Sequence, residues 1–278
     1  MWTVAETLSA DFDSRADVAE VDGQFVNVLN PGDAVAAARA RLRAGLGFTF
    51  ATLNLDHLVK RRADPAFRAA YARATLVSAD GAPIVALGRG QAPALRRTTG
   101  ADLLRPLCAL AEREGFAVAF FGSTDAVLRR AARRLREEFP GLRIALLESP
   151  AFGFDPFSDE AGLAGERIAA SGAKLVFVCL GAPKQELFAD RIAQVHRDIG
   201  FIGVGASADF IADAQVRAPR AMRRLGLEWL WRAGSDPRRL GVRYAQCALL
   251  LARIVIEQRL FAAAPARRGL RAGVAPAE

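Results

Sequence analysis

Short apolar runs that alternate with longer segments of helical spacing constrain the fold of this chain more than any other feature. Seven runs have the length of strands, and the segments 101–114, 124–138 and 183–195 have the length and periodicity of helices. The runs are apolar on both faces, which is typical of parallel strands covered by helices on both sides. The sequence therefore predicts an α/β fold with a mostly parallel, Rossmann-like sheet. The predicted strands are QFVNVL, FTFATLN, TLVSADG, AVAFFGS, RIALLE, KLVFVCLG and IGFIGVGAS.

The composition divides the chain into four parts. Residues 1–20 are a leader that we expect to be flexible, and residues 21–214 carry all of the alternating pattern and form the α/β core. Residues 215–262 differ in character and are expected to form a basic, helical appendage. Residues 263–278, which read APARRGLRAGVAPAE after one alanine, are expected to be a disordered tail.

Positive charge is concentrated at the carboxyl terminus. From Gln215 onward the chain has 13 arginines, no lysine and 4 acidic residues, a net charge of +9, whereas the rest carries −1. Such asymmetry indicates a polyanionic partner, either nucleic acid or an anionic membrane leaflet. The stretch from Pro237 to Leu260 is a predicted helix with interspersed arginines, which favours attachment at a membrane surface; the alternative is a helix packed on the core with its arginines in water.

Cysteine usage and the amino-terminal sequence indicate a cytoplasmic location. Cys108, Cys179 and Cys247 are spaced like neither a zinc site nor a disulfide framework, so we expect buried, reduced thiols. The first thirty residues contain acidic side chains and no apolar signal segment. No uncharged stretch reaches the length of a membrane span.

Polar residues follow two of the predicted strands. Thr52 and Asn54 come after FTFA, and Asp80 comes after the strand that contains Leu76-Val77. Ligands of parallel sheets bind at the carboxyl ends of strands, which makes these side chains candidates for a site. Each also has a purely structural interpretation, because Asn54 and Asp80 are good helix N-caps.

The segment CLGAPKQE predicts an anion site. Gly181 ends a predicted strand, Pro183 starts a helix, and Lys184 lies in the first turn. Unpaired N–H groups and the helix dipole already favour an anion at such a terminus, and a lysine adds a full positive charge. The alternative is that Glu186 offsets Lys184 locally.

Three other patterns suggest cofactor chemistry and are weaker. GVGASA, with Gly203, Gly205 and Ala208, resembles a dinucleotide-binding turn, but Pro219 follows too soon for a complete βαβ unit, which argues against an oxidoreductase. The Asp11–Asp13 motif DFD lies in the leader with no strand before it. The two histidines, His57 and His196, cannot build a metal cluster, so no metal or other cofactor is expected.

The ordered set of strand-end motifs resembles one family. TLNLDHLVKRRADPAFRAAYARATLVSADGAPIV, TTGADLL, FFGST, SPAFGF, LGAPKQE, GVGASADF and RAPRAMRRLGLEWLWR fall in the order found in the WecG/TagA/CpsF glycosyltransferases, glycosyltransferase family 26, over about 25–245. The resemblance implies inverting, metal-independent transfer of a hexose or N-acetylhexosamine from a UDP-sugar donor. The implied acceptor is a polyprenyl-diphosphate-linked saccharide on the inner face of the cytoplasmic membrane, in exopolysaccharide or cell-wall polymer synthesis.

The resemblance also assigns residues. Asp80 matches the family's proposed general base, Thr52 and Asn54 match its substrate-contacting T-x-N, and the C-terminal arginines would balance the charge of the departing diphosphate. Two departures, Ala208 before Asp209 and Asp213 in place of a usual glycine, suggest an altered pocket wall. The further residues expected at the substrate site are Gly81, Thr99, Asp102, Gly181, Lys184, Gln185, Glu186, Asp209, Arg238, Arg239 and Arg243.

The sugar and the assembly state stay open. Family members use N-acetylmannosamine, N-acetylmannosaminuronic acid or glucose, and homo-oligomers are compatible with all of these activities. A basic nucleic-acid-binding protein, with Trp229 and Trp231 as stacking platforms, is the alternative of a different class. It does not explain the ordered strand-end motifs, and we expect no nucleic acid as partner.

Overall fold

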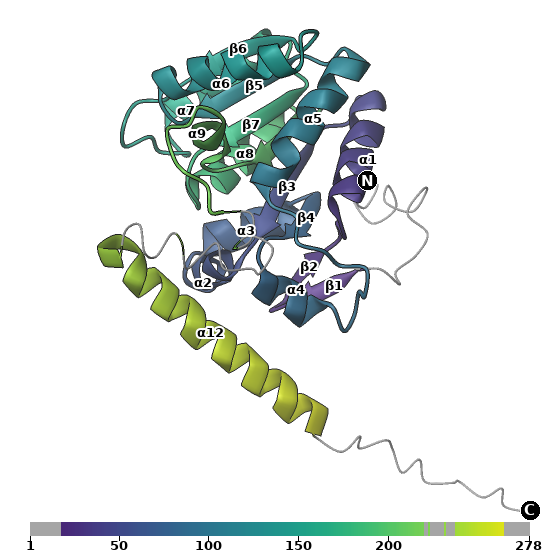
Figure 1. Cartoon of the computed structure of the whole chain (residues 1–278), viewed down its shortest axis with the longest axis vertical. Helices are drawn as coiled ribbons and strands as arrows, with labels where there is room; N and C mark the ends of the chain where they lie inside the picture. Colours follow the sequence, from purple (N-terminus) through teal and green to yellow (C-terminus); the bar gives the residue numbers. More distant parts are fainter. Residues whose placement is uncertain (1–17, 220–221, 223–230, 232–236, 264–278) are drawn as a thin grey trace, which may run out of the picture.

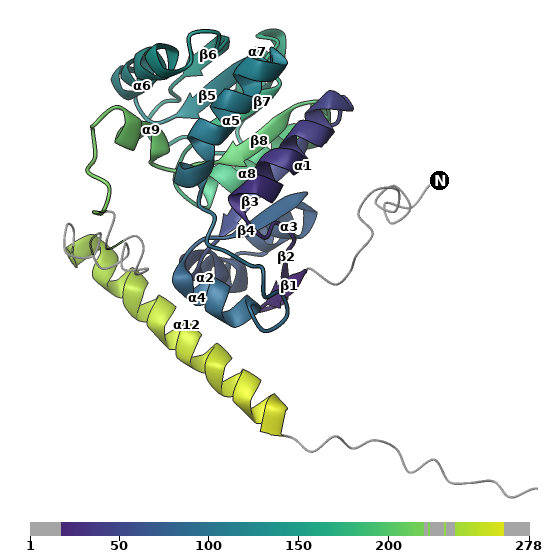
Figure 2. The same ribbon diagram turned by 45° about the vertical axis from the view of Figure 1, so that its right-hand side comes forward.

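A six-stranded parallel sheet forms the centre of the molecule (Figures 1 and 2). The computed structural model describes residues 18–219, 222, 231 and 237–263. The strand order is β4-β3-β8-β7-β5-β6, which confirms the predicted α/β fold with a mostly parallel sheet. The strands are β3 (Phe48–Leu53), β4 (Leu76–Ala79), β5 (Val118–Gly122), β6 (Ile144–Glu148), β7 (Leu175–Cys179) and β8 (Gly200–Gly203).

Helices cover both faces of this sheet, as expected for parallel strands that are apolar on both sides. One face packs against α1 (Pro31–Arg43), α5 (Gly100–Glu114), α6 (Asp125–Glu138) and the short α9 (Ser207–Ile211). The other face packs against α2 (Leu55–Ala63), α3 (Pro65–Arg73), α4 (Ala82–Gly88), α7 (Asp159–Ala170) and α8 (Lys184–Val195).

Alternate side chains of β5 enter the two cores. Phe120 stacks on Phe177 of β7 with ring centroids 4.9 Å apart on one face, and Phe121 stacks on Phe188 of α8 at 4.3 Å on the other. Each of these buried rings contributes roughly 1.5–3 kcal/mol of transfer free energy. The strand alternation thus fixes β5 between two helical layers.

The first predicted strand does not join the sheet. Instead of one strand QFVNVL, the chain forms an antiparallel ribbon of β1 (Ala19–Val21) and β2 (Gln24–Val26), and only Val28 makes an isolated bridge to Ser78 of β4. Asp22 and Gly23 adopt φ values of 52° and 70°, the left-handed conformations that close a two-residue hairpin. That turn was not recognised in the sequence. β1 begins inside the segment that we predicted to be leader.

The carboxyl-terminal helix α12 (Pro237–Ala263) lies against α2 (Figures 1 and 2). Its observed bounds confirm the helix predicted from Pro237 to Leu260. One face is buried through Cys247, Leu250 and Ile254, so the helix does pack on the core. None of the described helices combines the length and the apolar character that crossing a bilayer requires. All three cysteines are buried and free, as predicted.

Candidate functional site

The carboxyl ends of β3, β4 and β8 lie side by side because the strands are parallel neighbours. From β3 the chain moves to β4 on one side, and α5 then carries it across to β5 on the other side. Such a reversal of direction opens a crevice for ligands at the strand ends. We call this region, which includes Thr52, Asp80, Lys184 and Gly205, the carboxyl edge.

Asp80 extends the end of β4 without capping the next helix. Its backbone N–H donates to the carbonyl oxygen of Leu53 at 2.7 Å, which continues the β3–β4 ladder. The N-cap of α4 is Gly81, with φ of 106° and no side-chain cap hydrogen bond. The interpretation of Asp80 as an N-cap is therefore wrong. A glycine conformation disfavoured for other residues sets the direction of the chain directly after the carboxylate.

Thr52 and Asn54 are placed by the end of β3. Asn54 is the N-cap of α2, because its Oδ1 accepts from the His57 N–H at 3.0 Å, so the capping interpretation is confirmed for this residue. Thr52 is buried, and its backbone lies close enough to the His57 ring to oppose the lowering of the His57 pKa by burial. Both residues thus connect the carboxyl edge to His57 at the start of α2.

Four buried side chains form a cluster beneath the carboxyl edge, which we call the buried polar cluster: His57, Tyr71, Gln185 and Glu186. The Tyr71 hydroxyl lies 2.6 Å from His57 Nδ1. Gln185 Nε2 donates to Glu186 Oε1 at 2.7 Å, and Gln185 Oε1 accepts from the Gly205 N–H at 3.1 Å. His57 Nδ1 and Glu186 Oε1 are 3.9 Å apart. The cluster therefore links α2, α3 and α8 to the turn after β8.

Burial controls the ionisation of this cluster. It lowers the pKa of His57 to about 3, so the ring is neutral at physiological pH. It raises the pKa of Glu186 to about 7. Burial also raises the pKa of Tyr71, with further contributions from the negative charges of Glu186 and Asp80. The Asp80 carboxylate is thus close enough to Tyr71 to act on it electrostatically.

Lys184 is the first residue of α8, at the carboxyl edge. β7 ends at Cys179, two residues earlier than Gly181, and Pro183 is an N-cap without a side-chain hydrogen bond. Lys184 is exposed, and among the described residues it forms no ion pair with Glu186, which faces inward. The local offset that we considered is not formed, and the lysine and the helix terminus both present positive charge to solvent.

At the start of α5, Thr99 and Asp102 organise two arginines. Thr99 Oγ1 accepts from the Asp102 N–H at 3.2 Å and so caps the helix. The Asp102 carboxylate lies 3.1 Å from Arg97 and 2.8 Å from Arg217. Burial opposes its ionisation, but the two guanidinium groups outweigh burial and lower the Asp102 pKa. Sequence reasoning selected Thr99 and Asp102 and missed both arginines, although Arg97 directly precedes the TTGADLL motif.

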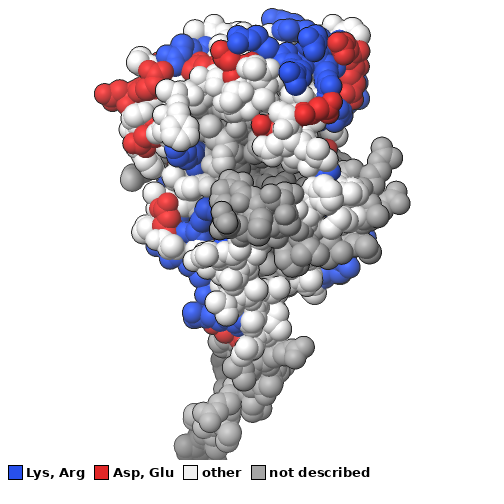
Figure 3. All heavy atoms as spheres, turned by 60° about the vertical axis from the view of Figure 1, so that its left-hand side comes forward, with Lys and Arg blue, Asp and Glu red and all other residues white. Residues whose placement is uncertain are grey.

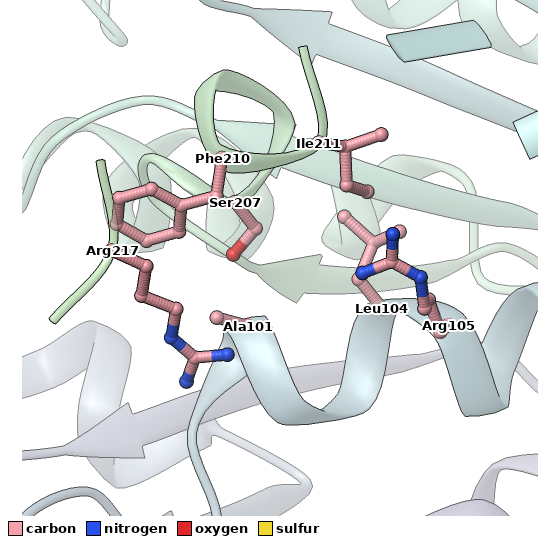
Figure 4. Close-up of a pocket in the computed structure, with 7 residues that line it drawn as sticks. All are labelled: Ala101, Leu104, Arg105, Ser207, Phe210, Ile211 and Arg217. Carbon is pink, nitrogen blue, oxygen red and sulfur yellow. The ribbon is translucent and has the colours of Figure 1, made fainter. Parts of the chain in front are cut away.

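A cavity of about 200 Å³ lies between α5 and α9 (Figure 4). Phe210 and Arg217 stand on one side of it, with the guanidinium carbon 5.9 Å from the ring centroid, and Leu104 and Arg105 stand on the other. It combines apolar walls with cationic groups, as a binding site for an anionic organic molecule requires. The residues that line it are Ala101, Leu104, Arg105, Ser207, Phe210, Ile211 and Arg217.

Asp209 lies on α9, near the end of β5. Its carboxylate accepts from Ser123 Oγ at 3.4 Å, and burial raises its pKa. Of the two departures from the family pattern, Ala208 is buried in the core beside Ser207, which lines the cavity, and Asp213 is on the surface in an ion pair with Arg134 at 2.5 Å. The expectation of an altered pocket wall stays a prediction. Asp213 has φ of 50°, which explains why a glycine suits this position.

Of the three α12 arginines that we expected at the substrate site, the structure describes the side chain of one, Arg243. Arg243 lies 2.9 Å from Asp56 at the start of α2, and Asp56 also pairs with Lys60. Arg238 and Arg239 are in the first turn of α12, but their side chains lie outside the described residues, as do Trp229 and the motif Asp11–Asp13. Arg243 thus fixes α12 to α2 in this structure.

The described residues contain neither a metal-binding cluster nor a complete dinucleotide-binding unit. In the part of the chain that the structure describes, no three His, Cys, Asp or Glu side chains are grouped in a way that could hold a metal ion. After β8, α9 has only five residues, and no further strand occurs within the described ranges. GVGASA therefore does not open a βαβ unit.

The chain matches the model of a known family. The model of the family described as Glycosyl transferase WecG/TagA/CpsF matches residues 19–265. The match begins at β1 and includes α12, so it covers the whole of the described fold except residue 18.

Proposed function

Because the chain belongs to the WecG/TagA/CpsF family of glycosyltransferases, we propose that it transfers a hexose or N-acetylhexosamine from a UDP-sugar to a polyprenyl-diphosphate-linked saccharide, with inversion. The observation that carries this proposal is the position of Asp80. Its carboxylate follows a buried strand at the carboxyl edge, and the next residue, Gly81, occupies the N-cap position of α4. A carboxylate fixed in this way is suited to general-base catalysis.

In the proposed reaction Asp80 takes the proton from the acceptor hydroxyl. The hydroxyl oxygen forms a bond to the anomeric carbon while the bond from that carbon to the UDP diphosphate breaks. Attack from the face opposite to the leaving group inverts the anomeric centre. One base of this kind contributes typically a hundredfold or more to the rate, so Asp80 would account for about 3 kcal/mol or more of the barrier reduction.

Positive charge at the carboxyl edge would stabilise the departing UDP. Lys184 and the N–H groups of the α8 terminus face solvent there, and Arg97 and Arg217 are held by Asp102 at the start of α5. Fixed cations and helix N-termini stabilise developing negative charge without reorganising during the reaction. These groups support a metal-independent mechanism.

The carboxyl-terminal helix supports attachment to the inner face of the cytoplasmic membrane. Opposite its buried face, α12 exposes an apolar stripe in which residues recur every three or four positions: Val242, Ala245, Leu249, Ala252 and Ile256. In Figure 3 the described part of this helix presents mainly uncharged surface, with basic side chains at its margin. An apolar stripe beside arginines binds anionic leaflets reversibly.

The decisive experiment is a panel of UDP-sugars tested with a synthetic polyprenyl-diphosphate-linked monosaccharide. We expect one donor, among those carrying N-acetylmannosamine, N-acetylmannosaminuronic acid or glucose, to give a disaccharide of inverted configuration. The Asp80→Asn variant serves as the negative control. Transfer to water alone, or shift of a nucleic acid in a mobility assay with no sugar transfer, would contradict the proposal.

A further inference from the structure

We infer that Glu186 is a positioning residue for this reaction: it remains a neutral carboxylic acid with its proton on Oε2 and, through Gln185, holds the Gly203–Gly205 turn in place. The kinetic consequence rests on the proposed function. The protonation of Glu186 does not depend on the proposed function, because it follows from the contacts within the buried polar cluster.

The orientation of the Gln185 amide shows which oxygen of Glu186 accepts its hydrogen bond. The Gly205 N–H can only donate, so the oxygen of the Gln185 amide must face it, and the amide NH₂ must face Glu186. Glu186 Oε1 receives that hydrogen bond at 2.7 Å. Because the carbonyl oxygen of a carboxylic acid accepts more strongly than the hydroxyl oxygen, we assign the proton of Glu186 to Oε2.

The surroundings of Glu186 Oε2 disfavour a negative charge. The residue is 6% exposed, and Oε2 has no hydrogen-bond partner among the described residues. A cavity of about 10 Å³ adjoins Glu186, Gln185 and Tyr71, which is space for about one water molecule. One water accepts a hydrogen bond from a neutral acid but cannot replace the solvation that a buried carboxylate loses.

That water would complete a directed chain of hydrogen bonds. It would accept from Glu186 Oε2–H and donate to the Tyr71 hydroxyl oxygen, which lies 2.6 Å from Nδ1 of the neutral His57 ring. The backbone of Thr52, at the carboxyl edge, lies next to this ring and acts on its pKa. Glu186 is thus connected to Thr52 on one side and to Gly205 on the other.

Among the described residues no cation forms an ion pair with Glu186, and the charge of Lys60 only partly offsets the effect of burial on its pKa. Lys60 and Arg243 both pair with Asp56, and Arg73 pairs with Asp190 at 2.6 Å. Lys184 on the same helix is exposed. The charged and titratable groups around Glu186 are Asp56, His57 and Lys60 of α2, Tyr71 and Arg73 of α3, Asp80 after β4, Lys184 and Asp190 of α8, and Arg243 of α12.

Ionisation would loosen the turn after β8. Burial raises the Glu186 pKa to about 7, so the neutral form dominates below that pH and the carboxylate above it. A carboxylate with one N–H donor recruits further donors or moves toward solvent, and either movement releases Gln185 from Gly205. Use of the donor sugar therefore declines as the pH rises.

The test compares the full-length wild type with Glu186→Gln, whose amide has the shape of the neutral acid and cannot ionise. Glu137→Gln is the matched control, because the Glu137 side chain is 67% exposed. Infrared difference spectra without substrate, from about pH 5 to about pH 9, follow the carbonyl stretch of protonated carboxyl groups. We expect a band that persists until about pH 7 in the wild type and in Glu137→Gln and is missing in Glu186→Gln.

The kinetic arm measures kcat/KM for the donor sugar at about pH 6 and about pH 8.5. Over this interval the neutral fraction of an acid with pKa about 7 falls roughly 30-fold. We expect kcat/KM of the wild type to fall tenfold or more, and that of Glu186→Gln to fall less than about threefold. A structural role alone would lower activity equally at both pH values.

Two results would overturn the inference. One is a Glu186 band that is lost by about pH 5, as for an ordinary glutamate. The other is a folded Glu186→Gln protein with the pH dependence of the wild type. If Glu186→Gln does not fold, Tyr71→Phe replaces it: loss of the acceptor for the water must shift the midpoint of the band, and an unmoved midpoint contradicts the chain. If the wild type transfers no sugar, the proposed function fails while the infrared titration still decides the state of Glu186.

Discussion

Replacement of Glu186 by glutamine should change how folding stability depends on pH. Burial raises the pKa of this carboxyl group from 4.5 to about 7. In the unfolded chain it ionises at its ordinary pKa, so the unfolded state binds fewer protons than the native state between these values. The contribution of Glu186 to the free energy of unfolding of the wild type is therefore fully present below about pH 4.5, and it is lost as the pH rises through about 7. At 1.36 kcal/mol per pKa unit, the complete loss is about 3 kcal/mol.

Urea denaturation of the wild type and Glu186→Gln at about pH 5 and about pH 8 measures this effect. Because the loss has already begun at pH 5, we expect the free energy of unfolding of the variant, relative to the wild type, to increase by about 2.5 kcal/mol between the two. Comparison of the two proteins removes the contribution of all other titrating groups that they share. The same difference for Glu137→Gln should be near zero. A relative stability of Glu186→Gln that is independent of pH would refute the assignment of a buried neutral acid.

Three further predictions concern the proposed reaction and the membrane. Asp80→Asn should lower turnover about a hundredfold or more in a protein that still folds; near-normal turnover in a folded variant would exclude a general base. Sugar transfer should persist in EDTA, and strict dependence on magnesium or manganese would exclude the metal-independent mechanism. Replacing both Leu249 and Ile256 with Gln should weaken sedimentation with anionic vesicles about tenfold or more, because each side chain removes over 1 kcal/mol of apolar burial; the control is Val195→Gln, at an exposed position on α8. Unaltered sedimentation would show that the stripe does not face the bilayer.

The order of strands and helices was readable from the sequence because local periodicity encodes it. Parallel strands buried on both faces give continuous apolar runs, and β3 to β8 all fall within such runs. The same reasoning assigned QFVNVL to the sheet, since the pattern of a short strand does not say which strand it pairs with. The β1–β2 hairpin, which keeps this segment out of the sheet, depends on left-handed conformations at Asp22 and Gly23. The Asp-Gly pair in the sequence is a signal for such a turn.

The candidate site was predictable in position and less so in detail. Strand ends located Asp80 and Thr52, but the choice of Gly81 as the cap depends on a φ of 106°, which the sequence does not state. Arg217 reaches Asp102 across 115 positions of the chain, a contact that no local pattern reports. The inward direction of Glu186 was equally hidden, because a glutamate in the first turn of a helix is usually explained by the helix dipole.

The central place of β8 has a consequence for how the protein is made. β8 is the last strand in the described part of the chain, and it joins the pair β3-β4 to the group β7-β5-β6 through its contacts with β3 and β7. During synthesis on a ribosome the two groups must therefore wait, each with an uncovered strand edge, until Gly200 has emerged to pair with Phe48. A pause in translation before that point exposes β3 and β7 to pairing with other nascent chains, and codons that speed passage through 196–203 would shorten the exposure. Completion of the sheet therefore depends on when β8, a strand of four residues, is synthesised.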